Sequence, residues 1–187
     1  PRSPSLPFFP SVLPSPSRLG ERFLQLEAAR AALEAISAER LEAAWRGAVE
    51  DALGPPGAAL RDAMASTLRL SSRGLTTGLV TVLEGARSED ALRLLTTARR
   101  AGPGSALVLL AANVPGLAVQ VLLPAIALRR PLLIKSSSRE PHFARFFLDA
   151  LARREPVLGE AFAATSWPGG DVDRDRVALD AASRVVA

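Results

Sequence analysis

The sequence predicts an α/β fold in which a helical segment precedes a doubly wound parallel sheet. From residue 21 to about residue 100, apolar residues recur at spacings of three to five, which is typical of amphipathic helices. After the glycines at 102 and 104, short continuous apolar runs alternate with helical patterns. Repeated strand–helix units of this length imply right-handed crossovers, with helices packed on both faces of a parallel sheet.

Three regions follow from these changes of pattern. Residues 1–20 begin with six prolines in sixteen positions and predict an extended or disordered lead-in. Residues 21–101 form the helical segment, and residues 102–187 form a partial α/β domain. Because the chain starts at a proline and stops inside an expected strand, we expect it to be a truncated piece of a longer protein.

The helical segment contains three expected helices. A GPPG break ends the first helix, and the stretch SSRGLTTG separates the second from the third. Ser88 can cap the third helix, whose first turn is acidic and whose last turn carries two arginines. The expected helices cover residues 21–53, 58–70 and 88–102.

In the second half, a continuous apolar run at 105–113 predicts a strand buried on both faces of a parallel sheet, and three later runs predict further strands. These expected strands cover residues 105–113, 131–135, 161–167 and 183–187. The expected helices between them cover residues 115–129, 140–155 and 171–182. Ligands of such sheets bind at the carboxyl ends of the strands, so the polar residues at those ends are the candidates for a site.

Composition excludes several classes of function. Hydrophobic residues make up 48% of 187, enough for a sizeable core. The net charge of +4 comes from arginines scattered among acidic residues, so we expect no nucleic-acid partner. Without cysteine and with a single histidine, the chain has no disulfide, thiol nucleophile or histidine pair for a metal. Because it has neither a secretion signal nor an apolar run of about 18 residues, we expect a cytoplasmic protein without a membrane span.

Lys135 is the only lysine of the chain and ends the second expected strand. Three serines follow it, beside the amino end of the next helix, where free N–H groups and the helix dipole favour a phosphate. Ser137 and Ser138 are therefore candidate cofactor-binding residues together with Lys135. The alternative is a chance lysine followed by a serine that caps the helix.

Other strand ends carry weaker candidates. Asn113, the only asparagine, follows the first strand, where its amide could donate to a developing oxyanion or simply cap the next helix. Gly169 and Gly170 follow the third strand and either let the backbone approach a cofactor or form a tight turn. His142 lies in the first turn of a helix, a position typical of a capping or surface residue.

Three segments together carry a resemblance to a known family. ANVPG at 112–116, PLLIKSSSREPHFARFFLDALA at 131–152 and WPGGD at 167–171 resemble, in order and spacing, acyl-CoA reductases of the bacterial luminescence-operon type (LuxC-like). These enzymes belong to the aldehyde dehydrogenase superfamily. The likeness spans roughly residues 100–187 and is weaker through the helical half.

The resemblance implies an aldehyde dehydrogenase-like nucleotide-binding domain and assigns roles within it. It places Asn113 in the oxyanion hole and Lys135 on the adenosine ribose or its 2′-phosphate. Ser138 stands where NAD-preferring members often have glutamate. Since a carboxylate would repel a 2′-phosphate and a hydroxyl can donate to it, the expected cofactor is NADPH.

The implied reaction is reduction of a fatty acyl thioester to an aldehyde, through a catalytic cysteine expected beyond residue 187. The implied partners are a fatty acyl-CoA or acyl-protein thioester, with a homo-oligomer or a complex with acyl-transfer proteins as candidate assemblies. Two alternatives remain open. One is a nucleotide-binding module without catalysis, and the other is an acyl-phosphate reductase of the same fold, which WPGGD and SSSREP favour less.

Overall fold

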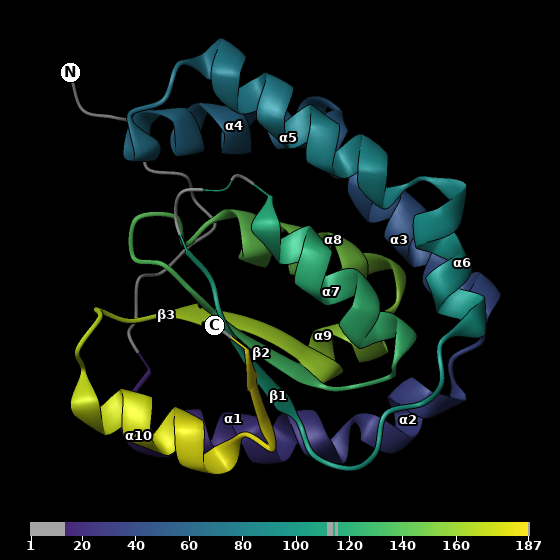
Figure 1. Ribbon diagram of the computed structural model, residues 1–187, viewed down its shortest axis with the longest axis vertical. Coiled ribbons are helices and arrows are strands. Elements are labelled where there is room, and N and C mark those ends of the chain that lie inside the picture. The colour runs from purple at the N-terminus through teal and green to yellow at the C-terminus, as the bar shows by residue number, and fades with distance from the viewer. Residues whose placement is uncertain (1–13, 112–113, 115, 187) are drawn as a thin grey trace.

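The computed structural model describes residues 14–111, 114 and 116–186 and shows an α/β architecture (Figure 1). Its sheet has four strands, all parallel, in the order β3-β2-β1-β4. The strands are β1 (Ala106–Leu109), β2 (Leu132–Ser136), β3 (Phe162–Ser166) and β4 (Arg184–Val186). The prediction of an α/β protein with a parallel sheet is confirmed.

The described helices fall into two groups along the chain. Before the sheet lie α1 (Pro16–Ala28), α2 (Arg30–Ala35), α3 (Ala38–Leu53), α4 (Pro55–Leu68), α5 (Ser72–Ala86) and α6 (Glu89–Thr97). Between the strands lie α7 (Leu117–Ala127), α8 (Phe143–Arg154), α9 (Pro156–Ala161) and α10 (Val172–Ala181). Each connection between successive strands thus contains at least one helix, as parallel pairing requires.

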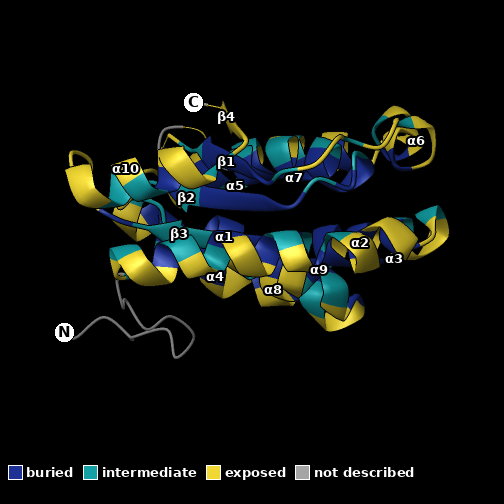
Figure 2. Cartoon of the chain, turned by 90° about the horizontal axis from the view of Figure 1, so that it is seen from below, coloured by how far each residue is buried: buried dark blue, intermediate teal, exposed yellow. Residues whose placement is uncertain are grey.

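Helices cover both faces of the sheet because successive strand residues point to opposite sides. Leu107 of β1 and Leu133 of β2 pack with α1 and α10 in one hydrophobic cluster. Val108 and Ile134, the next residues of the same strands, pack in the other cluster with α3, α7 and α8. Figure 2 shows the dark blue β1 and β2 enclosed by helices whose exposed sides turn outward.

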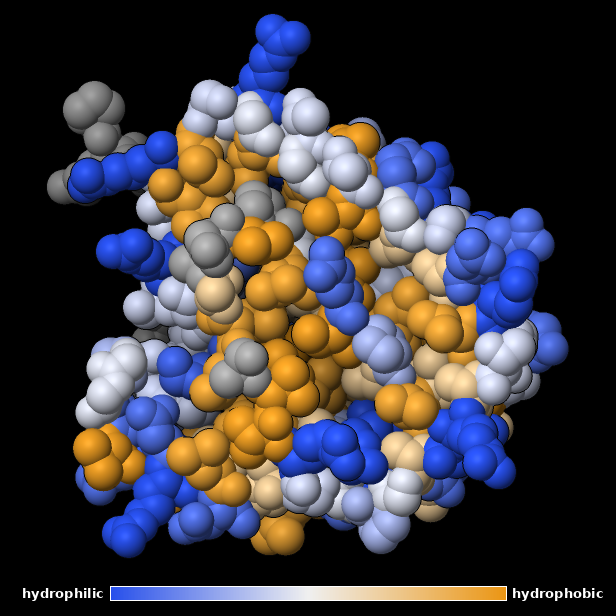
Figure 3. Space-filling view, in the orientation of Figure 1, coloured by the Kyte–Doolittle hydropathy of each residue, from blue (hydrophilic) through white to orange (hydrophobic). Residues whose placement is uncertain are grey.

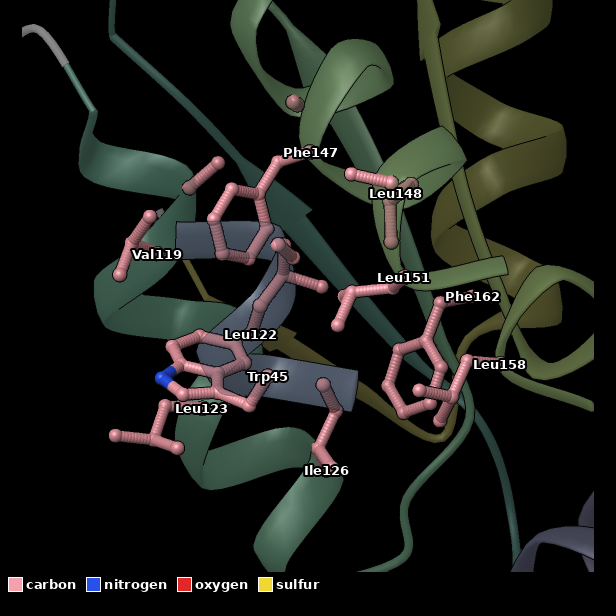
Figure 4. Close-up of a cluster of buried hydrophobic side chains, with 14 of the residues drawn as sticks. Trp45, Val119, Leu122, Leu123, Ile126, Phe147, Leu148, Leu151, Leu158 and Phe162 are labelled. Carbon is pink, nitrogen blue, oxygen red and sulfur yellow. The ribbon is translucent and has the colours of Figure 1, made fainter. Parts of the chain in front are cut away.

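One buried tryptophan ties the helical segment to the α/β half (Figure 4). Trp45 of α3 contacts Phe147 of α8 edge to face, with ring centroids 5.1 Å apart. Its indole N–H donates to the carbonyl of Ala86 over 2.9 Å. Since residues of α3 to α8 and of three strands belong to the same cluster, the two halves share a hydrophobic core.

Several elements differ from the sequence-based expectation. The expected helix 21–53 is divided into α1, α2 and α3, with breaks at Ala29 and at Ile36 and Ser37. Helix α1 begins at Pro16, inside the expected lead-in, because the Ser15 side chain caps it and proline suits a first helical turn. The SSRGLTTG stretch lies mostly within α5, which Ser71 caps. A short helix, α9, separates α8 from β3.

The edge strand β4 is exposed. Among the described residues it pairs only with β1, and the exposed fractions of Val185 and Val186 are 40% and 47%. Figure 3 shows hydrophobic surface extending over this side of the molecule. In the described part of the chain, no helix combines the length and the apolar character needed to cross a bilayer.

Candidate nucleotide site at the carboxyl edge of the sheet

Lys135 lies near the carboxyl end of β2, paired in register with Leu109 of β1 and Thr165 of β3. Its ammonium nitrogen lies 5.0 Å from the centre of the Trp167 ring, just after β3. An ammonium at this distance from an indole gains a favourable cation–π interaction. The contact therefore links the carboxyl ends of β2 and β3 through Lys135, the only lysine of the chain.

The Trp167 ring is held in place from the other side. It is 1% exposed, and its indole N–H donates to Asp175 Oδ1 of α10 over 2.7 Å. Lys135 itself is only half-buried and forms no ion pair with any carboxylate in the described ranges. The buried Trp167 ring therefore contacts an ammonium group that has no acidic partner in the part of the chain that the structure describes.

The serines that follow Lys135 have different environments. Ser136, which the sequence argument did not single out, is 1% exposed, and its hydroxyl has no hydrogen-bond partner within residues 14–111, 114 and 116–186. The Ser137 hydroxyl accepts from the Arg139 amide over 3.2 Å, and Ser138 is exposed. Only Ser138 combines exposure with a hydroxyl that no described group occupies.

Glu140 caps the amino end of α8. Its Oε1 accepts from the amides of His142 and Phe143 over 3.0 and 2.8 Å. Burial raises the pKa of Glu140, although these two amides act in the opposite direction. The expectation that free N–H groups at this helix end hold a phosphate is therefore wrong for these two amides, and no serine caps α8.

The two glycines after Trp167 form a turn. Gly170 has a positive φ of 82°, which glycine adopts without strain. An added Cβ at Gly169 or Gly170 would meet no atom within 4 Å, so neither glycine is needed for close packing inside this chain. Asp171 then caps α10 and pairs with Arg174. The turn leaves open space around both glycines.

A cavity of about 1010 Å³ opens on the opposite side of the β2 end. Its lining includes Arg69 and Leu70 after α4, Ala111 after β1, and Ser137 and Arg139 after β2. Ser137 thus borders a different space from Lys135, which is not part of the lining. The sequence argument missed Arg69, which lies inside the expected helix 58–70 but after the observed end of α4, and Arg139, which directly follows the serine cluster.

Asn113, the candidate oxyanion donor, lies outside the described residues. Across residues 14–111, 114 and 116–186, no three acidic or histidine side chains are grouped so that they could hold a metal ion. The site therefore consists of one lysine, one tryptophan, hydroxyl groups and a glycine turn. This chemistry suits an anionic ligand with a flat ring or sugar better than a metal.

Comparison with known proteins adds no family assignment. No protein-family model matches the chain, and no curated protein matches it either.

Proposed function

We propose that this chain is the nucleotide-binding, N-terminal portion of an NADPH-dependent acyl-CoA reductase with an aldehyde dehydrogenase-like, doubly wound fold. The observation that carries the proposal is Lys135, a cation without an acidic partner among the described residues, held over Trp167 where two parallel strands end. One further observation supports it. Helices cover both faces of the sheet, as in doubly wound nucleotide-binding folds, although the strand order reverses between β1 and β4, one strand away from Lys135.

The residues present fit a dinucleotide phosphate. The Lys135 ammonium offers charge-assisted hydrogen bonds, and Ser138, three residues further along the chain, has an exposed hydroxyl that can donate. Open space next to Gly169 and Gly170 leaves room for the ribose. With neither a glutamate at position 138 nor a described carboxylate paired with Lys135, a 2′-phosphate meets no direct repulsion from either position, which favours NADPH.

Bound NADPH would supply the hydride that reduces the acyl group. In this proposal Asn113 donates its amide to the carbonyl oxygen as negative charge develops there. The chain contains no cysteine, so the nucleophile that forms the thioester has to come from a longer protein. The absence of cysteine also favours a second candidate function, which is a module that binds the nucleotide without catalysing any reaction.

The test uses the purified 187-residue chain and the longer protein that the proposal implies. We expect the chain to bind NADPH, observed as quenching of tryptophan emission, and to oxidise none when acyl-CoA is added. The longer product should bind NADPH and should oxidise it when acyl-CoA is added. Replacing the cysteine nucleophile of that longer product by serine should abolish oxidation but not binding. NADPH oxidation by the 187-residue chain, or failure of either protein to bind NADPH, contradicts the proposal. A longer product that binds NADPH but reduces neither acyl-CoA nor acyl phosphate supports the binding module.

A further inference from the structure

We propose that this chain forms a two-fold symmetric dimer, in which α10 of each copy packs over the groove between α7 and β4 of the other. The inference goes beyond the proposed function, since it involves neither Lys135 nor a nucleotide. It starts from β4, whose three residues are all exposed although the sheet is parallel. Strands of parallel sheets are normally buried on both faces, so β4 lacks a cover among the described residues.

The groove is a cavity of about 450 Å³ with an apolar floor. Val108 of β1 and Leu132 of β2 form this floor and are 6% and 2% exposed. Val121 and Pro124 of α7 line one side, and Val186 of β4, which is 47% exposed, lines the other. Figure 3 shows hydrophobic surface in the middle of this face, where Figure 1 places α7 and the C-terminal end. The groove therefore suits large apolar side chains.

The topology explains why α10 does not cover the groove of its own copy. Helix α7 connects β1 to β2, whereas α10 connects β3 to β4 in the opposite direction along the sheet. Right-handed crossovers that run in opposite directions lie on opposite faces. Accordingly, Leu122 of α7 belongs to one hydrophobic cluster and Ala178 of α10 to the other. Val186 pairs with Val108 and faces the α7 side, so α10 of the same copy cannot reach it.

The charged groups of the groove are basic. Arg130 and Arg184 line it, and none of its described lining residues is acidic. Burial and then the nearby Arg184 guanidinium lower the pKa of Arg130. Neither arginine forms an ion pair with a described carboxylate, and Arg130 instead donates to the Gly104 carbonyl over 2.8 Å. The groove thus favours a helix that presents carboxylates beside apolar side chains.

The exposed face of α10 has this composition. Val172 and Leu179 are 73% and 47% exposed, and their spacing of seven places them on one side of the helix. No other described helix carries two exposed large apolar residues. Asp173 and Asp180 are exposed next to them and form no ion pair with any described residue, while Arg176 is the one exposed basic residue of α10. This face therefore complements the groove in both hydrophobicity and charge.

The two complementary surfaces lie on the same side of the molecule. Figure 1 shows α7 above the sheet and α10 below it, and Figure 2 shows α10, β4 and α7 together in the upper half of the view. A two-fold axis that passes close to β4 can thus bring each α10 to the groove of the other copy, which makes the same contact twice. Val185 and Val186 then lie near the axis and become covered. One interface accounts for the exposed residues of both β4 and α10.

The experiment is analytical ultracentrifugation of the 187-residue chain over a series of concentrations, which gives the dissociation constant of the dimer. We expect this constant to rise at least about tenfold in Arg184→Glu and in the double variant Asp173→Lys/Asp180→Lys, because each places like charges across the interface. Arg73→Glu makes the same charge reversal at an exposed position on α5, outside the groove lining, and should change the constant less than about twofold. Circular dichroism checks that each variant is folded.

Mixing the two defective variants separates a contact between copies from an effect within one copy. In a mixed dimer, the introduced glutamate faces the introduced lysines, and the second contact keeps the natural Arg184 and both aspartates. We expect the equimolar mixture to form a heterodimer whose dissociation constant lies within about threefold of the wild-type value.

Three results would overturn the inference. A wild-type chain that stays monomeric at about 0.1 mM would leave the groove to a different partner. A wild-type dimer that neither variant weakens would associate through another surface. An equimolar mixture that remains as weak as its two components would show that the aspartates of α10 do not face Arg184 of the other copy.

Discussion

The Lys135 ammonium lies 5.0 Å from the centre of the Trp167 ring, which links the carboxyl ends of β2 and β3. Trp167 is buried and hydrogen-bonded to Asp175, so the lysine rests on a surface that cannot rotate away. A lysine at this point keeps a compact charge above the ring, whereas the wider guanidinium of arginine needs more room. Because a guanidinium also stacks well on aromatic rings, the contact with Trp167 does not by itself explain why the chain's only lysine stands here.

The first prediction concerns cofactor preference. We expect Lys135→Ala to weaken NADPH binding about ten- to a hundredfold and NADH binding much less, because only NADPH offers the extra phosphate. Ser138→Glu should shift the preference the same way by placing a carboxylate beside that phosphate. Calorimetric titration with both cofactors measures the ratio, and Arg99→Gly serves as the charge control. An unchanged NADPH to NADH ratio in either variant would remove these residues from the 2′-phosphate.

The strand β2 was predictable because both of its faces are buried. Leu132, Leu133 and Ile134 are all nearly inaccessible, so β2 appears in the sequence as an unbroken apolar run. The position of Lys135 at the end of that run followed directly. Its contact with Trp167 did not, because it depends on the register between β2 and β3, which the residue pattern of one strand does not contain.

Sequence signals gave a wrong boundary for α5 and a wrong capping residue for α8, because tertiary contacts outweigh the local helix propensity there. Glycines and threonines make residues 71–78 a weak helix former, yet Leu75, Leu79 and Leu83 are fully buried at a spacing of four and hold α5 together. At α8, the serines appeared to be the natural capping residues. Glu140 took that role because its carboxylate reaches two amides at once.

The second prediction concerns pH and the contact between α3 and α8. Hydrogen bonds from Arg154 and then Arg153 lower the pKa of Asp51, with N–O distances of 2.8 to 3.0 Å. Because the folded pKa is lowered, the unfolded chain takes up a proton first as pH falls. Asp51 therefore stabilises the fold above the ordinary aspartate pKa, and this contribution disappears as pH falls through the folded pKa.

We accordingly expect Asp51→Asn to lower the free energy of unfolding by about 1 kcal/mol at neutral pH. The difference from the wild type should shrink below about pH 4. Urea unfolding at a series of pH values measures it, and Asp62→Asn is the control because Asp62 is exposed without an ion pair to any described residue. A difference that stays constant down to the lowest pH would show that the arginine contacts do not stabilise the fold through the Asp51 charge.

The third prediction compares two glycines of neighbouring helices. A Cβ on Gly57, in the first turn of α4, would lie 2.0 Å from the carbonyl oxygen of Ala52 and 2.6 Å from its carbonyl carbon. Backbone atoms cannot move aside as a side chain does, and Arg61 holds the same carbonyl through a 2.7 Å hydrogen bond. A Cβ on Gly78, inside α5, would meet nothing within 4 Å.

We expect Gly57→Ala to lower the free energy of unfolding by about 1 to 3 kcal/mol, since the clash would separate the end of α3 from the start of α4. Gly78→Ala should raise it by about 0.5 to 1 kcal/mol, because alanine loses less conformational entropy in a helix than glycine. Both values come from urea unfolding followed by circular dichroism. If Gly57→Ala proved as stable as Gly78→Ala, the α3–α4 junction would have to be looser than its close backbone approach indicates, and α4 would not be held firmly enough to position Arg69 at the cavity.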